Sequence, residues 1–240
     1  MTEETEKPLM DGRWDERTEL LIGTEAAHKL RHSHILIVGT GGVGGYAAEM
    51  LCRAGVGRLT LVDADVVNPS NINRQIIALH STVGRSKVEV LADRLLDINP
   101  RVKVYPVAAF QKDEAMEELL DAAKYDFVVD AIDSLSPKVF LIALSKRRGL
   151  PVISSMGAGA KRDASLIEVA DIARSYNCTL ARAVRKRLSK LGISRGVPVV
   201  FSSELPDESS VMEIEGERCK RSTAGTISYM PAIFGCRIAA

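Results

Sequence analysis

The chain has 240 residues, with 32 Lys and Arg against 31 Asp and Glu, so its net charge of +1 provides no global field that favours nucleic acid or a membrane surface. Hydrophobic residues make up 46% and charged residues 26%, an ordinary globular balance. The length fits one sizeable α/β domain, or one domain with an appended lobe, that can bury a core without disulfide or metal staples.

Several classes of protein are disfavoured by the sequence. No run of about 18 apolar residues is present, as a transmembrane helix would require, and the start "MTEETEKPLMDGRW" is too acidic and polar for a signal peptide. Cys52, Cys178, Cys219 and Cys236 form no CxxC pair, which argues against structural zinc. Reduced thiols in a cytoplasmic protein fit best. We also expect a truncated chain, because "PAIFGCRIAA" ends it within an apolar pattern.

Strands alternate with helices in the first two thirds of the chain. Short apolar strands are predicted at residues 34–39, 58–63, 102–107, 126–131 and 150–155. Helices are predicted at 13–33 as one or two pieces, 42–54, about 86–98, about 112–123, and 137–148, which Pro137 opens. This alternation predicts an α/β fold with a doubly wound, mainly parallel, Rossmann-like sheet.

The chain is expected to form a single domain with three regions. Residues 1–12 form a disordered tail, and 13–156 form a nucleotide-binding core. Residues 157–240 extend the sheet and add a substrate-facing lobe. In this last region the sequence predicts strands at 164–172 and 197–203, a basic helix at 179–192 and an irregular polar loop at 204–224.

The stretch "GTGGVGG", residues 39–45, follows the first strand directly. Gly39, Gly41 and Gly44 fit the dinucleotide fingerprint, and Gly42 adds to the loop. A strand, glycine loop and helix in this order direct backbone N–H groups and a positive helix end at a phosphate. Asp63, which closes the second strand, is expected to hold ribose hydroxyls. On these features NAD and ATP fit equally well.

The long polar connection at 64–83 favours ATP, because connections of this length tend to carry function. A dehydrogenase needs one acid after its second strand, whereas this stretch adds Asp65, Asn71, Arg74 and Gln75. Arg74 offers a fork of donors that suits phosphate oxygens. Lys87 falls in the first turn of its helix, where a cation is poorly placed unless a bound polyanion compensates. The alternative for Lys87 alone is a solvated surface lysine.

Two carboxylates follow the fourth strand in "VVDAIDS". Asp130 closes that strand, at the end of the sheet where ligands bind. Because a carboxylate beside a polyphosphate is repelled, we expect Mg²⁺ to lie between Asp130 and the phosphates. Asp133 lies one loop further and is expected to contact nucleotide or metal, or else to cap the next helix. Together these cations and carboxylates suit an enzyme that forms an adenylate on the α-phosphate of ATP.

The motifs "GTGGVGG", "GVGRLTLVDAD", "NINRQ", "VGRSK" and "DAIDS" resemble the adenylyltransferase superfamily of ubiquitin-activating enzymes and their bacterial relatives in thiamine and molybdopterin synthesis. The resemblance implies Asp63 on ribose, Asp130 on Mg²⁺, and Asn71, Arg74 and Lys87 on phosphates. It also implies a homodimer in which an N-terminal arginine reaches the partner's site. Arg17 matches that arginine, with Arg13 as the reserve.

The stretches "RTELLIG", "LARAVRKRL" with "VVFSSELP", and "SYMPAIFG" are similar to the tRNA threonylcarbamoyladenosine dehydratases of this superfamily. That similarity implies ATP-dependent activation of the threonyl carboxylate on a modified tRNA adenosine, followed by closure to a cyclic hydantoin. An adenylyltransferase for a ubiquitin-like sulfur-carrier protein is the alternative, although such enzymes usually carry two CxxC pairs. A nucleotide-binding module without ATP chemistry is the third hypothesis. A sulfur-transfer partner and a monovalent cation stay open.

Residues 174–196 contain an excess of cations and no acid. This local charge favours RNA binding, independently of the family resemblance. The residues expected at phosphates are Arg182, Arg185, Lys186, Arg187 and Lys190, the alternative being a solvated basic face. Tyr176 could stack on a base or simply pack. Cys219, flanked by cations, and Cys178, before the basic helix, could carry a reactive thiolate, although inert packing is the commoner role. His80 is expected to be structural.

Overall fold

The described part of the chain contains a central sheet of seven strands in the order β3-β2-β1-β4-β5-β7-β6. The computed structural model describes residues 13–109, 114–213 and 222–240, so the predicted tail 1–12 lies outside it. The strands are β1 (His34–Val38), β2 (Arg58–Val62), β3 (Lys103–Val107), β4 (Phe127–Asp130), β5 (Val152–Ser155), β6 (Ile167–Asp171) and β7 (Pro198–Ser202). All neighbouring pairs are parallel except β6 with β7. The predicted doubly wound, mainly parallel sheet is confirmed.

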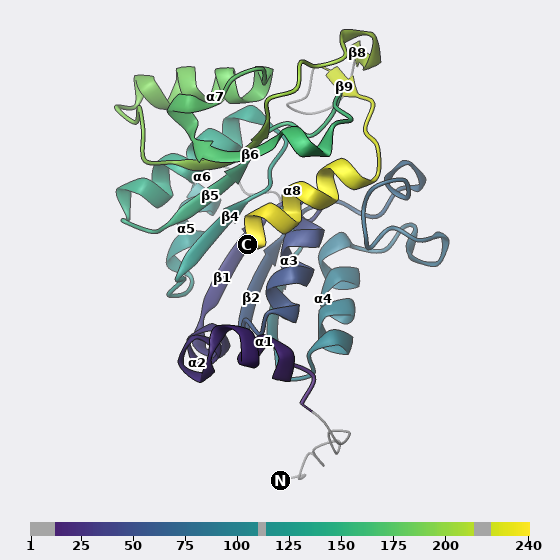
Figure 1. Cartoon of the computed structure of the whole chain (residues 1–240), viewed down its shortest axis with the longest axis vertical. Coiled ribbons are helices and arrows are strands. Elements are labelled where there is room, and N and C mark those ends of the chain that lie inside the picture. The colour runs from purple at the N-terminus through teal and green to yellow at the C-terminus, as the bar shows by residue number, and fades with distance from the viewer. Residues whose placement is uncertain (1–12, 110–113, 214–221) are drawn as a thin grey trace.

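Helices cover both faces of this sheet (Figure 1). They are α1 (Glu16–Ile22), α2 (Thr24–His32), α3 (Gly44–Arg53), α4 (Lys87–Ile98), α5 (Glu114–Asp121), α6 (Leu135–Arg147), α7 (Thr179–Lys190) and α8 (Tyr229–Ala239). Successive side chains of a strand point to opposite faces. In β1, Ile35 and Ile37 therefore pack with α3, α4 and α8, whereas Leu36 and Val38 pack with α5 and α6. This two-sided burial explains why β1 is apolar from Ile35 to Val38.

Three element predictions need correction. Helix α6 begins at Leu135, so Pro137 lies inside its first turn, where its missing N–H costs nothing, and does not open the helix. Only Ile167–Asp171 of the predicted strand 164–172 is extended, and 3-10 turns flank it. The polar loop 204–224 contains a two-stranded antiparallel sheet, β8 (Val211–Glu213) with β9 (Ser222–Ala224).

Helix α8 has no counterpart among the elements predicted from the sequence. The apolar stretch "PAIFGCRIAA" forms most of this helix, which buries Met230, Phe234 and Ile238 in the main core. A Cβ atom on Gly235 would lie only 2.5 Å from the Val43 carbonyl oxygen and 2.7 Å from the Cβ of Tyr46. Helices α8 and α3 therefore pack with their backbones close together. No helix within the described ranges combines the length and the apolar character needed to cross a bilayer.

A buried ion pair joins β4, α6 and β5. The Lys138 ammonium lies 2.8 Å from Oδ2 of Asp130, and neither side chain is exposed. Lys138 also donates to the Ser154 hydroxyl (3.1 Å) and the Ser155 carbonyl (2.8 Å), and the Ser154 hydroxyl donates to Asp130 (2.5 Å). The backbone N–H of Ile132 donates to Oδ1 (3.1 Å). Burial raises the pKa of the Asp130 carboxyl, against the opposing effect of Lys138, so the carboxylate depends on its partners.

Replacing Lys138 with Met is expected to lower the free energy of unfolding by about 3–5 kcal/mol at neutral pH, because it leaves the buried carboxylate uncompensated. Since Asp130 would then fold best when protonated, the deficit should shrink as the pH falls toward the carboxyl pKa of the unfolded chain. Urea unfolding of Lys138→Met against Lys146→Met, an exposed lysine of the same helix, measures this. Equal stability of the two variants would contradict a structural role for the pair.

Candidate nucleotide site

The glycine loop joins β1 to α3 at the carboxyl end of the parallel strands. Gly39 has φ +92°, and a Cβ there would lie 2.6 Å from the Ala131 carbonyl oxygen. A Cβ on Gly44 would lie 1.8 Å from the carbonyl oxygen of Gly39. A Cβ on Gly42 would lie 3.0 Å from Cβ of Pro231 at the start of α8. A Cβ on Gly41 would make only an ordinary van der Waals contact, at 3.5 Å from Nε2 of Gln75. The other three glycines are thus needed for packing, and at Gly41 the backbone stays open to a ligand.

Asp63 lies directly against this loop, as a ribose-binding residue would. Its Oδ2 accepts hydrogen bonds from the backbone N–H of Thr40 (2.8 Å) and from the Thr40 hydroxyl (3.0 Å). Its Oδ1 accepts from the backbone N–H of Asp65 (2.9 Å). These bonds fix the carboxylate at the end of β2, and Oδ1, which accepts one hydrogen bond, has a further lone pair for a hydroxyl donor.

Gln75 and Arg74 come from the connection between β2 and α4. Gln75 is buried beside Gly41, and its Oε1 has no hydrogen-bond partner within the described residues. A buried acceptor without a partner is rare in folded proteins, so this oxygen is suited to a bound ligand. Among the described residues, Arg74 donates only through Nη1, to the Ser70 carbonyl (2.8 Å) and to Oδ1 of Asn73 (2.8 Å). Its other donors stay available for phosphate oxygens.

Asn71 has a local structural role besides the predicted phosphate contact. Its side-chain oxygen accepts a hydrogen bond from the backbone N–H of Asn68 (3.0 Å), across the short 3-10 helix Pro69–Asn71. Only the amide nitrogen of this buried side chain remains for the predicted phosphate contact.

Lys87 is the first residue of α4 and is 5% exposed. Its ammonium lies 2.7 Å from Oδ2 of Asp65, a carboxylate that is mostly exposed. We expected only a bound polyanion to compensate a cation at this helix start, but Asp65 already supplies a counter-charge. A buried ammonium with one exposed partner remains able to exchange that partner for a phosphate.

The structure contradicts the prediction that Asp130 faces the phosphates through Mg²⁺. Its side chain is fully buried and both of its oxygens accept hydrogen bonds inside the protein. Asp133, three residues later, is exposed just before α6 begins at Leu135. The signal that was missed is Lys138, a lysine within an otherwise apolar stretch of α6, which requires a buried acid.

Arg17 lies on α1, at the amino end of the sheet and therefore opposite the glycine loop (Figure 1). Its side chain is exposed, whereas Arg13 pairs with Asp15 (3.2 Å) and with Glu19. Helix α1 buries none of its residues, and Leu20 and Leu21 are 79% and 86% exposed. The structure thus does not bring Arg17 to the glycine loop of its own chain.

Helix α7 packs on α6 through its apolar residues and carries cations of two kinds. Arg185 donates through Nη1 to the carbonyls of Ile172 (3.2 Å) and Ser175 (2.8 Å), so it anchors the helix. Arg187 donates to the Ser136 hydroxyl (2.7 Å) while staying exposed. The remaining cations recur at four-residue spacing on one exposed face: Arg182, Lys186 and Lys190. Of the five predicted RNA contacts, Arg185 is therefore mainly structural.

The other candidate residues have ordinary surroundings. Tyr176 stacks edge-on against Phe201, and its hydroxyl donates to Glu168 (3.0 Å), which favours packing over base stacking. Cys178 is buried at the start of α7 and accepts from the Ala181 N–H at 3.5 Å.

Burial raises the pKa of the Cys52 thiol to about 12, so this thiol is unreactive at neutral pH. Cys236 and His80 are exposed, and Cys219 lies outside the described residues. Within those residues no three His, Cys, Asp or Glu side chains are grouped as a metal cage.

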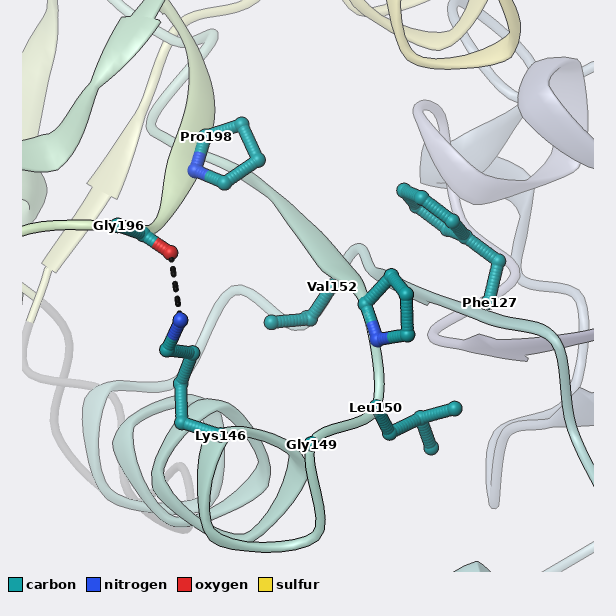
Figure 2. A pocket seen from close by; sticks show the side chains of 8 residues that line it. Phe127, Lys146, Gly149, Leu150, Val152, Gly196 and Pro198 are labelled. Carbon is teal, nitrogen blue, oxygen red and sulfur yellow. Dashed lines mark hydrogen bonds between the residues drawn. The ribbon is translucent and has the colours of Figure 1, made fainter.

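A cavity of about 340 Å³ lies at the other end of the sheet, where β4, β5 and β7 begin (Figure 2). It is lined by Phe127, Val152 and Pro198, the first residues of these strands, and by Lys146, whose ammonium donates to the Gly196 carbonyl at 3.0 Å. Ligands of open parallel sheets bind at the carboxyl ends of the strands. This cavity is therefore separate from the glycine loop.

Comparisons with known proteins agree with this geometry. Residues 16–240 match the model of the ThiF family. The tRNA threonylcarbamoyladenosine dehydratase of Bacillus subtilis is 44% identical over 190 residues, which are 79% of this chain and 74% of the relative. The Escherichia coli dehydratase is 40% identical over 206 residues, 82% of this chain and 76% of the relative. A crystal structure of the E. coli enzyme in complex with ATP superposes with a TM-score of 0.84 at 35% identity, covering 93% of this chain and 89% of that one. The chain belongs to the ThiF family.

Proposed function

We propose that this protein is an ATP-dependent tRNA threonylcarbamoyladenosine dehydratase. The observation that carries the proposal is the arrangement of an open glycine loop, the unpartnered Oε1 of Gln75 and the cations Arg74 and Lys87, in a chain 44% identical to a dehydratase of that name. The crystal structure of the related E. coli enzyme with ATP supports a nucleotide in the same place.

The chemistry requires charge stabilisation and orientation from the protein more than a nucleophile. The threonyl carboxylate attacks the α-phosphate, pyrophosphate leaves, and an acyl adenylate forms. A nitrogen of the same modified base then attacks the acyl carbon, AMP leaves and the hydantoin ring closes. Arg74 and Lys87 would offset the charge that builds up on the phosphates. Because the second attack is intramolecular, correct orientation replaces an enzyme nucleophile.

The residues present fit Mg²⁺ if Asp133 supplies the carboxylate. Mg²⁺ prefers oxygen ligands and is usually held by one or two carboxylates together with substrate phosphates, without an all-protein cage. Asp133 is exposed two residues after Ala131, whose carbonyl lies against the glycine loop, whereas Asp130 is fully buried. When bound, the ion would neutralise phosphate charge; Asp133 would orient it.

Asp133→Asn and Lys87→Met are each expected to lower ATP–pyrophosphate exchange by roughly 10²–10³-fold, since each removes a preorganised charge. Asp133→Asn should stay folded, because the side chain is exposed and its amide replacement has nearly the same shape. Glu89→Gln, an exposed acid in the first turn of α4, is the matched control and should keep full exchange. Calorimetry that found tight NAD binding and no ATP binding would refute the nucleotide assignment.

The proposal includes a homodimer in which Arg17 acts in the partner's site. Arg17 lies at the wrong end of the sheet for its own glycine loop, and exposed Leu20 and Leu21 give α1 an apolar surface that a second copy would cover.

Mixing Arg17→Ala chains with Lys87→Met chains should recover up to about a quarter of the wild-type activity, since half of the randomly paired dimers would contain one intact site of two. Light scattering with exchange of labelled subunits verifies that mixed dimers form. Exchange without any recovery of activity would contradict the shared site.

The exposed face of α7 formed by Arg182, Lys186 and Lys190 is proposed to contact tRNA phosphates. Replacing these three residues with Ala should reduce the slope of log affinity against log salt by roughly one unit for each lost contact, with ATP affinity unchanged. Arg185→Ala is the comparison: it removes hydrogen bonds to Ile172 and Ser175 and should lower stability instead. Normal tRNA binding by the triple variant would rule this face out.

A further inference from the structure

A second cavity, of about 650 Å³, lies beside the nucleotide site and is lined by residues of four segments, among them Asn73, Lys161, Arg162, Asp207 and Thr226. It shares a wall with the glycine loop region. The amide nitrogen of Asn73 donates to the Thr226 carbonyl (2.9 Å), and its oxygen accepts from Arg74 (2.8 Å). Its volume lies in the range of small-molecule sites.

Two neighbouring cations of this cavity, Lys161 and Arg162, differ in how many N–H donors remain for a ligand. Lys161 is 4% exposed and donates to the carbonyls of Asn177 (3.1 Å), Ser202 (2.9 Å) and Glu204. An ammonium has three N–H donors, so Lys161 has none left for a ligand. It acts as a fixed link between the loop after β5 and the segment that leads into α7.

Arg162 is fixed at its backbone and accessible at its guanidinium. Its N–H donates to Oε2 of Glu204 (2.8 Å), and its carbonyl accepts from the Tyr229 hydroxyl (2.8 Å). The side chain is 71% exposed and pairs with Asp207 through Nη2. A guanidinium has five N–H donors in a planar fork, so several remain for a carboxylate.

The backbone that presents Arg162 is held in an unusual conformation. Ala160 has φ +59°, in the left-handed region that costs a non-glycine residue about 1 kcal/mol or more. Two hydrogen bonds hold it there: its N–H donates to the Gly225 carbonyl (2.8 Å) and its carbonyl accepts from the N–H of Asp207 (2.9 Å). Backbone strain that hydrogen bonds to neighbouring segments hold in place is characteristic of functional sites.

We propose that this cavity receives the threonylcarbamoyl group of the tRNA and that Arg162 binds its carboxylate. The inference rests on the proposed function and adds the substrate pocket to it. The cavity lies between the glycine loop, which it joins through Asn73, and the start of α7, which it joins through Lys161 and Asn177. A tRNA held along α7 would thus present its modified base beside the nucleotide. Asp207 holds the Arg162 fork in place through Nη2, and the remaining N–H donors would bind the substrate carboxylate.

The test compares binding of two tRNAs, one carrying threonylcarbamoyladenosine and one identical except for an unmodified adenosine. Arg162→Gln should weaken binding of the modified tRNA by about 10- to 100-fold, the range for a lost hydrogen bond to a charged group. Binding of the unmodified tRNA should stay unchanged. Arg162→Lys keeps the charge without the fork and should lose part of this preference. Lys186→Gln on α7 is the matched control and should weaken binding of both tRNAs equally. Unchanged binding of the unmodified tRNA also reports that the Arg162 variants fold.

Two results would overturn the inference. If Arg162→Gln lost affinity for both tRNAs equally, Arg162 would be assigned to a phosphate contact. If the variant kept its full preference for the modified tRNA, Arg162 would not recognise the threonylcarbamoyl group. Conversion of the modified tRNA to its cyclic form by the unaltered enzyme with ATP is measured first. If that conversion is absent, the proposed function fails; if it is present while Arg162→Gln keeps the preference, only the pocket assignment fails.

Discussion

The buried pair between Asp130 and Lys138 determines how the carboxyl end of the sheet is built. It fixes the end of β4 against α6 and β5, and the turn that follows β4 is held in turn by a hydrogen bond from the Ala131 N–H to the Val38 carbonyl at 2.9 Å. That turn lies so close to the glycine loop that a Cβ on Gly39 would be 2.6 Å from the Ala131 oxygen. The nucleotide loop thus rests on a turn whose position depends on two charges that never reach solvent. Removing either charge would disturb the loop without touching any residue that faces a ligand.

The basic residues divide into two groups by the number of donors already in use. Lys138 and Lys161 each donate three hydrogen bonds inside the protein, and they join segments that are distant in sequence. Arg74, Arg162 and the exposed face of α7 keep donors that nothing within the described chain satisfies. Because a desolvated cation is stable only when its donors are paired, the first group contributes to architecture. The second group is available for phosphates and carboxylates, and it extends from the glycine loop past the second cavity toward α7.

The sequence predicted the alternation of strands and helices, the glycine loop and Asp63 because each depends on local pattern: apolar runs, glycines at a fixed spacing and an acid at a strand end. It failed where the answer depends on a contact far along the chain. Asp130 and Asp133 are both acids after a strand, and only the position of Lys138 on α6 distinguishes the buried one. Helix α8 was missed because it is apolar on nearly every side and has a proline in its first turn, a pattern that does not identify a helix until α3 is known to lie against it.

The packing of α8 against α3 also has a consequence for biogenesis. Residues 44–53 and 229–239 contact each other although most of the described chain separates them, so this part of the fold has a high contact order. On the ribosome, the sheet and α3 emerge long before their covering helix, and the apolar surface that will hold Met230 and Phe234 stays open during that interval. A nascent chain at that stage would be a natural client for chaperones. Since Pro231 also packs on Gly42, the glycine loop reaches its final shape only after α8 has been synthesised.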